Sequence, residues 1–296
     1  MVSIIPSDRA AALVDPNQLP SIAEEYNLRP AQTAHRINVL RSSGIQNGDR
    51  ILEIGCGQGD CTSALAMIFP ESQIDAIDPG ALDYGTPETL GQAQERIKTY
   101  DFGSRITFHQ AIPKHFLAGV QNATYDVAVF CHCLWYFASQ QEYRSTFEAA
   151  RGKVKKLFIA EWGLESSTEE GRVHVSAALT RAACEARIHS STENIRSPGT
   201  PATIKDLAKE AGVGCMEEGW FVPETELEDA RREIGSVVKQ DGDGSSAFLK
   251  RSRDKGVDEV GYEMLENMLG TVKSALEGVG GMGSVRCMDV WWGWFE

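Results

Sequence analysis

The stretch DRILEIGCGQGD, residues 49–60, constrains the fold of this chain more than any other part of the sequence. A β-rich run ends in Glu53, glycines follow at alternate positions from 55 to 59, and helix-compatible residues begin at Asp60. Glycines at such a turn let the backbone approach a ligand closely and adopt conformations that a Cβ forbids. The order of strand, glycine turn and helix therefore predicts a nucleotide-type binding loop.

Short apolar runs alternate with helical patterns along the chain after this loop. Because such alternation builds parallel strands with crossover helices on both faces, it predicts an α/β fold with a Rossmann-like, seven-stranded, mostly parallel sheet. The predicted strands are residues 50–54, 73–78, 105–110, 126–132, 156–162, 215–222 and 285–295. The predicted crossover helices are residues 60–69, 87–100 and 140–151.

Further helical patterns lie outside this alternating core. Pro30 opens an amphipathic helix that ends at Gly44. Capping-box pairs predict three later helix starts, at Ser167 with Glu170, Thr203 with Asp206 and Thr225 with Glu228. We therefore expect an N-terminal helical lid (1–45), a cofactor-binding core (46–165), a helical cap insertion (166–199), a core helix and strand (200–223), a second helical insertion (224–284) and a last core strand (285–296).

The C-terminal segment is rich in aromatic residues: Trp291, Trp292, Trp294 and Phe295. Such a cluster can form a membrane or dimer patch, but aromatic side chains are more often buried in a core. We expect these rings to pack in the core from a hairpin at the edge of the sheet.

Composition and charge narrow the class of partner. The 296 residues carry a formal net charge of −13 without a dense Lys/Arg stripe, which argues against nucleic acid. No run approaches the roughly 18 apolar residues that span a bilayer, and no signal-like N-terminus precedes the core, so we expect a cytoplasmic protein without a membrane partner. The seven cysteines lack Cys-x-x-Cys pairing, which indicates reduced thiols and no metal site. The sequence leaves open whether the protein is a monomer or a homodimer.

The charges around the glycine turn discriminate among ligands. A dinucleotide fingerprint requires a third glycine where Asp60 stands, and a phosphate loop requires a lysine that is missing from Asp60-Cys61-Thr62. Glu53 adds a second carboxylate, which is unfavourable beside phosphates but favourable for an ammonium and a sulfonium. Asp78 follows Gly59 by 19 residues, close to the spacing at which an acidic residue meets ribose hydroxyls. The pattern favours S-adenosylmethionine over a dinucleotide.

Three motifs resemble those of class I S-adenosylmethionine-dependent methyltransferases: LEIGCGQGD, IDAIDPG and DVAVFCHCLWYF. The resemblance covers about residues 30–165, and NLRPAQTAHR and DYGTPETLGQAQ are similar to elements of fungal small-molecule methyltransferases. It implies S-adenosylmethionine as cofactor, held at its methionine end by Glu53, Gly55, Cys56 and Gly57 and at its ribose by Asp78. It also implies cofactor contacts from Pro79, Tyr84 and Cys131. The acidic residue that usually contacts adenine is missing, so Gln110, Ala111 and Ile112 are expected there instead.

Candidate catalytic and substrate-binding residues follow the fourth and fifth strands. His132 ends the fourth strand, where doubly wound sheets bind ligands, and is the leading candidate for a general base, with a purely structural role as the alternative. Glu161 is a second candidate base. The residues expected to line the substrate pocket are Trp135, Tyr136, Trp162 and, from the lid, Tyr26. Arg29, Gln32 and His35 are further lid or cofactor contacts.

These observations predict methyl transfer to an oxygen, nitrogen or carbon of a small, hydrophobic metabolite, as in secondary metabolism. One alternative is a cyclisation or rearrangement with bound S-adenosylmethionine on the same scaffold, and another is a non-catalytic regulatory or scaffold protein. The acidic charge and the predicted cap argue against protein or RNA as acceptor.

Overall fold

The computed structural model describes residues 23–296 and contains a seven-stranded sheet in the order β3-β2-β1-β4-β5-β7-β6. Strands β1 to β5 are parallel neighbours, whereas β7 is antiparallel to both β5 and β6. The strands are β1 (Arg50–Ile54), β2 (Gln73–Asp78), β3 (Ile106–Gln110), β4 (Tyr125–Cys131), β5 (Val154–Trp162), β6 (Cys215–Phe221) and β7 (Val290–Phe295). The predicted Rossmann-like, seven-stranded and mostly parallel sheet is confirmed.

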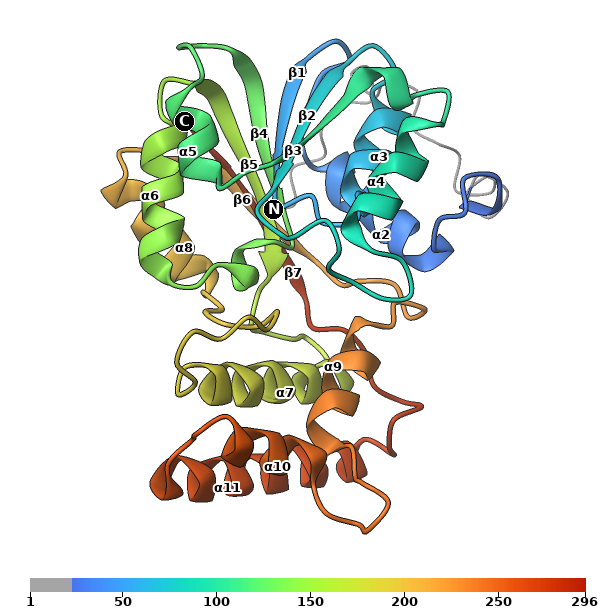
Figure 1. Cartoon of the computed structure of the whole chain (residues 1–296), viewed down its shortest axis with the longest axis vertical. Coiled ribbons are helices and arrows are strands. Elements are labelled where there is room, and N and C mark those ends of the chain that lie inside the picture. The colour runs from blue at the N-terminus through green and yellow to red at the C-terminus, as the bar shows by residue number, and fades with distance from the viewer. Residues whose placement is uncertain (1–22) are drawn as a thin grey trace.

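Helices cover both faces of the sheet (Figure 1). One face packs against α2, α3 and α4 through buried residues such as Ile37, Leu65 and Ile97, and the other packs against α5, α6 and α8 through Leu117 and Phe147. These helices are α2 (Pro30–Arg41), α3 (Asp60–Ile68), α4 (Leu90–Lys98), α5 (Pro113–Ala118), α6 (Gln140–Ala150) and α8 (Pro201–Glu210).

Four further helices form a separate layer beyond the carboxyl ends of the parallel strands, at the bottom of Figure 1. They are α7 (Glu169–Glu185), α9 (Asp229–Val238), α10 (Ala247–Asp254) and α11 (Glu259–Gly278). Their buried side chains form one apolar cluster that also contains Trp135 and Trp162 from the core. We call this layer the cap. Among the described residues, no helix is long and apolar enough to cross a bilayer.

The aromatic C-terminal strand differs from the prediction in place and length. It lies between β5 and β6 rather than at the edge of the sheet, and it begins at Val290 instead of residue 285. The preceding segment belongs to the cap, because the Met288 amide donates to His174 Nδ1 and the Asp289 amide donates to the Glu165 carbonyl. Trp291 and Phe295 are fully buried, so their predicted core packing is confirmed.

The three predicted capping boxes are wrong. The side chain that caps α7 is Thr168, which accepts from the Gly171 amide at 3.1 Å, whereas Ser167 and Glu170 form no such pair. Ser167 instead donates from both its amide and its hydroxyl to Asp289. This competing long-range contact shifts the start of α7 by one residue.

The other two helix starts also move. Pro201 occupies the first turn of α8, so the cap falls on Thr200 instead of on Thr203 with Asp206. Helix α9 begins at Asp229, and the predicted pair Thr225 with Glu228 does not cap it. Thr225 instead donates to the neighbouring Glu226 carboxylate.

Helix α2 differs from the predicted amphipathic helix because it buries polar as well as apolar side chains. Its buried residues include Gln32, Thr33 and His35 as well as Ile37 and Leu40. Its apolar side packs on α3 and the sheet, while Gln32 Nε2 donates to Asp229 Oδ2 at 2.5 Å and so ties the helix to the cap. Polar side chains of α2 therefore lie inside the protein, at the junction of core and cap.

Candidate active site

The glycine turn after β1 adopts the conformation that its sequence requires. Gly55, Gly57 and Gly59 all have positive φ values, of 77°, 53° and 87°. A Cβ on Gly55 would lie 2.5 Å from Cys133 Cβ, and one on Gly59 would lie 2.5 Å from Ile97 Cδ1, so these two positions pack against the protein. A Cβ on Gly57 would meet nothing within 4 Å. Gly57 therefore borders open space, as a backbone that contacts a ligand must.

Two carboxylates flank this turn in different environments. Glu53 is 2% exposed and accepts from Thr62 Oγ1 at 2.5 Å, and burial raises the pKa of its carboxyl to about 7. Asp78 accepts from the Gly57 amide at 2.9 Å and from the Gly80 amide at 2.7 Å. A cationic ligand beside Glu53 would relieve the cost of its buried charge.

The predicted adenine and ribose contacts lie along the rim beyond Asp78. Pro79 follows Asp78 directly, Gln110 ends β3 and is exposed, and Ile112 is 47% exposed. The Ala111 amide donates to the Asp78 carbonyl at 3.0 Å, which brings the two strand ends together.

Two other predicted cofactor contacts have protein partners. Tyr84 is 55% exposed, and its hydroxyl donates to Asn194 of the cap connection at 3.2 Å. The side chain of Cys131 lies in the core cluster between the sheet and α3, together with Cys61. Cys56, within the glycine turn, is also buried in this cluster.

His132 follows the last residue of β4 and lies at the centre of a cluster of buried titratable side chains. It has a left-handed φ of 51°, which is sterically unfavourable for a residue with a Cβ, and its amide is fixed by the Ala160 carbonyl at 2.8 Å. Its Nε2 lies 2.9 Å from Nε2 of His35, and its Nδ1 lies 3.4 Å from Glu161 Oε1. Both imidazole nitrogens therefore face protein groups.

The arrangement continues beyond this histidine pair. His35 Nδ1 lies 3.4 Å from Glu224 Oε2, and Asn38 Nδ2 donates to the other oxygen of that carboxylate. The indole of Trp162 covers the pair, with ring centroids 5.5 Å from His35 and 4.4 Å from His132. His35 is fully buried, whereas the Glu224 side chain is 31% exposed.

The buried groups have strongly perturbed acidities. Burial raises the pKa of Glu161 to about 7, against the stabilising amides of Trp162 and Leu134, which donate to its two oxygens. Burial, helped by the positive charge of Arg36, lowers the pKa of His132 well below its usual value. His132 is therefore neutral at pH 7, the form that can accept a proton.

The predicted aromatic pocket residues divide into two groups. Trp135 and Trp162 are buried between core and cap, and Trp135 Nε1 has no hydrogen-bond partner among the described residues. Tyr136 is 47% exposed at the same strand end. Tyr26 lies elsewhere, because it packs on Tyr100 and Phe102 and its hydroxyl donates to Asp101 at 3.1 Å, before β3 begins.

Two residues of this site were missed in the sequence. Glu224 stands in the segment PETELED, where nothing distinguishes it from the neighbouring carboxylates. Arg36 follows His35 on α2, and its Nε is buried without a hydrogen-bond partner in residues 23–296. The other predicted lid contact, Arg29, forms an ion pair of 2.5 Å with Asp60 at the start of α3.

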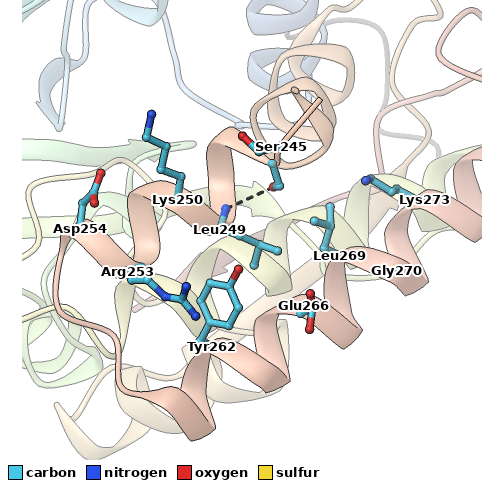
Figure 2. Close-up of a pocket in the computed structure, with 11 residues that line it drawn as sticks. Ser245, Leu249, Lys250, Arg253, Asp254, Tyr262, Glu266, Leu269, Gly270 and Lys273 are labelled. Atoms are coloured by element: carbon cyan, nitrogen blue, oxygen red, sulfur yellow. Dashed lines mark hydrogen bonds between the residues drawn. The ribbon is translucent and has the colours of Figure 1, made fainter. Parts of the chain in front are cut away.

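A separate hollow of about 500 Å³ lies within the cap, between α10 and α11 (Figure 2). Leu249 and Leu269 form its floor, while Lys250, Arg253 and Glu266 are among the charged residues around it. It lies away from the glycine turn and the histidine pair, which belong to the core.

Fold and site together define a class of protein. A positive-φ glycine turn that opens onto empty space, a buried acid able to balance a cation, and Asp78 at the next strand end fit S-adenosylmethionine. Residues 51–156 match the family model described as a methyltransferase domain. The chain therefore contains a methyltransferase domain and has the fold of class I S-adenosylmethionine-dependent methyltransferases.

Individual relatives extend this likeness beyond the matched domain. The methyltransferases phomM and phomM' of Diaporthe leptostromiformis are each 27% identical over 287 residues, which covers 83% of this chain and 73% of the relative. A cyclopropane-fatty-acyl-phospholipid synthase-like protein from Lactobacillus casei superposes with a TM-score of 0.79 at 24% identity, over 95% of this chain and 99% of that one. This structural likeness shows that the cap and core together form a recurring fold.

Proposed function

We propose that the protein transfers the methyl group of S-adenosylmethionine to an oxygen, nitrogen or carbon of a small, hydrophobic metabolite. The observation that carries this proposal is the meeting of His132 and Glu161 at the carboxyl ends of β4 and β5, beneath the cap. Ligands of doubly wound sheets bind at this edge. The same edge carries Asp78 and the glycine turn, so the methyl donor and a proton acceptor share one site.

The size and polarity of the acceptor follow from what encloses the site. The cap lies across the strand ends, and Trp135, Tyr136 and Trp162 supply an aromatic wall. The net charge of −13 disfavours a polyanionic acceptor. A small apolar molecule fits this enclosure better than a protein or RNA segment.

The proposed cofactor contacts follow the order of the strands. Glu53, Gly55, Cys56 and Gly57 hold the methionine end, Asp78, Pro79 and Tyr84 face the ribose, and Gln110, Ala111 and Ile112 face the adenine. Cys131 supports the turn from beneath through its packing with Cys61. When bound, the cofactor supplies an activated methyl group, so the protein mainly positions the acceptor and removes its proton.

His132 and Glu161 together form the proposed base. Neutral His132 is the group that accepts the proton of the acceptor in this proposal. The Glu161 carboxyl group, 3.4 Å from His132 Nδ1, stabilises the imidazolium that results. A base of this kind contributes roughly 10²- to 10⁴-fold to the rate for an acceptor that must lose a proton.

The test is calorimetric titration with S-adenosylmethionine and S-adenosylhomocysteine, followed by a metabolite screen that detects S-adenosylhomocysteine formation. We expect micromolar cofactor binding that Asp78→Ala abolishes and that Asp83→Ala, an exposed carboxylate on the following loop, preserves. Thermal melts of both variants control for folding. Absence of binding to the wild-type protein would contradict the proposal.

A further inference from the structure

The hollow in the cap is formed by one face of α10 and one face of α11 (Figure 2). Its lining residues recur three or four positions apart, and residues at this spacing share one side of a helix. They are Ser246, Leu249, Lys250, Arg253 and Asp254 on α10 and its N-cap, and Tyr262, Glu266, Leu269, Gly270 and Lys273 on α11. The volume of about 500 Å³ lies within the roughly 300–1,000 Å³ of small-molecule sites.

We propose that this hollow is a second ligand site, which binds a small molecule with an apolar body and a single carboxylate group. The hollow lies away from the glycine turn and from His132, so its ligand is separate from the methyl donor and the acceptor. The inference therefore goes beyond methyl transfer and does not depend on it.

The floor of the hollow is apolar. Leu249 of α10 and Leu269 of α11 belong to the buried cluster of the cap, and Tyr262 packs against that cluster. Figure 2 shows the two leucines between the helices, in the middle of the hollow. An apolar ligand body that covers these side chains removes their remaining surface from water, which favours binding.

Gly270 leaves one wall of the hollow without a side chain. It lies in the interior of α11, where glycine disfavours the helical conformation. A Cβ at this position would meet no atom within 4 Å, so packing against the protein does not require the glycine. A larger residue would take up space that the hollow leaves free for a ligand.

The cations around the hollow are only weakly neutralised by the protein. Lys250 lies 3.8 Å from Asp241 and Arg253 lies 3.8 Å from Glu259, and these are the longest ion pairs within residues 23–296. Lys273 has no carboxylate within 4.0 Å in that part of the chain. In a chain with a net charge of −13, such cations form a local site for an anion.

The two ends of the hollow have different roles. The Arg253 guanidinium carbon lies 3.9 Å from the centroid of the Tyr262 ring, and this cation–π contact closes one end. Lys273 lies at the opposite end (Figure 2). Lys273 is therefore the cation that binds the carboxylate, while the apolar body extends over the floor towards Tyr262.

Two acidic residues limit the ligand to one negative charge. Glu266 precedes Lys273 by seven residues, which is two helical turns or about 10 Å along α11. Asp254 lies beyond Arg253, at the end away from Lys273 (Figure 2). Both carboxylates would repel a second anionic group on the apolar body, so a monocarboxylate fits the hollow better than a dicarboxylate.

The experiment is calorimetric titration of the full chain at pH 7 with decanoate and with decylammonium, each below the concentration at which it forms micelles. The two probes carry the same apolar chain, so their difference isolates the charge. We expect saturable one-to-one binding of decanoate, at least roughly tenfold tighter than that of decylammonium. Failure of decanoate to bind, or equal affinity for both probes, would overturn the proposal.

Lys273→Met tests the carboxylate contact, because it removes the charge and keeps an unbranched side chain. The loss of one charge-assisted hydrogen bond should weaken decanoate binding at least roughly tenfold. Lys255→Met is the matched control, since Lys255 is an exposed lysine between α10 and α11 that does not line the hollow. We expect this control to bind decanoate as the wild type does.

Gly270→Leu tests the space itself and should abolish binding of decanoate. Gly235→Leu in α9 is its control, because a Cβ at Gly235 also meets no atom within 4 Å and the residue does not line the hollow. Thermal melts verify that each variant folds. Wild-type affinity in Lys273→Met or in folded Gly270→Leu would place decanoate elsewhere and refute the site. These titrations need neither S-adenosylmethionine nor an acceptor, so their outcome is independent of methyl transfer.

Discussion

Replacement of Gly57 by alanine separates the two roles that a glycine can have in the turn after β1. The residue has a φ of 53°, and an added Cβ meets no atom within 4 Å. The left-handed conformation costs a non-glycine residue about 1–2 kcal/mol. We therefore expect the variant to fold with a melting temperature lower by roughly 2–8 °C, at about 2–4 °C per kcal/mol for a chain of this size class.

Gly57→Ala should weaken cofactor binding much more than it lowers the stability of the fold. The new methyl group would occupy the space in which the methionine end of the cofactor contacts the turn. Loss of one or two charge-assisted hydrogen bonds, each worth about 1.5–3 kcal/mol, weakens binding by roughly tenfold to more than a hundredfold. Calorimetric titration with S-adenosylhomocysteine measures this loss directly.

Gly152→Ala is the matched control. Gly152 also has a positive φ, of 75°, and open space around its Cβ position, but it precedes β5 at the opposite edge of the sheet. We expect Gly152→Ala to lose about as much stability as Gly57→Ala but to keep the wild-type affinity for S-adenosylhomocysteine. If Gly57→Ala bound S-adenosylhomocysteine as tightly as Gly152→Ala, the placement of the cofactor over Gly57 would be refuted.

Three further predictions concern single side chains. The pKa of Glu53 in the folded protein is raised from 4.5 to about 7, so the free energy of unfolding should fall as pH rises between these two values, by about 3 kcal/mol at most. Glu53→Gln should remove this part of the pH dependence, as measured by urea unfolding. An unchanged pH profile in the variant would contradict the raised pKa. Trp291→Ala should lower the free energy of unfolding by about 3–5 kcal/mol, because the side chain is fully buried, and a loss below 1 kcal/mol would place the ring outside the core. Thr168→Ala should cost about 1 kcal/mol in the same assay through loss of the α7 cap, whereas Glu170→Ala should not lose a capping interaction.

The core strands could be predicted from sequence because each is a local pattern. The runs that end in Glu53-Ile54 and Asp78 form β1 and β2 within the predicted residues, and the glycine turn has the expected conformation. His132 was predicted inside the fourth strand but lies one residue beyond it, in a left-handed conformation. Such a conformation is set by the surrounding fold rather than by the local sequence.

Long-range contacts explain what the sequence pattern missed. The α7 cap moved to Thr168 because Asp289, 122 residues away from Ser167, competes for that side chain. Glu224 reaches His35 across 189 positions in the chain, and no spacing rule connects them. The aromatic composition of β7 could not reveal its place inside the sheet either. That place depends on pairing with β5 on one side and β6 on the other, which are distant in the sequence.

The interior position of β7 has a consequence for how the chain folds during synthesis. Strand β6 contacts the sheet through β7, which is made about 70 residues later, after α9 to α11. Until then β5 presents an open hydrogen-bonding edge, which is a template for association with other chains. A nascent chain therefore benefits from rapid synthesis of residues 222–295 or from a chaperone that shields β5, and slow codons in this stretch should increase aggregation of newly made protein.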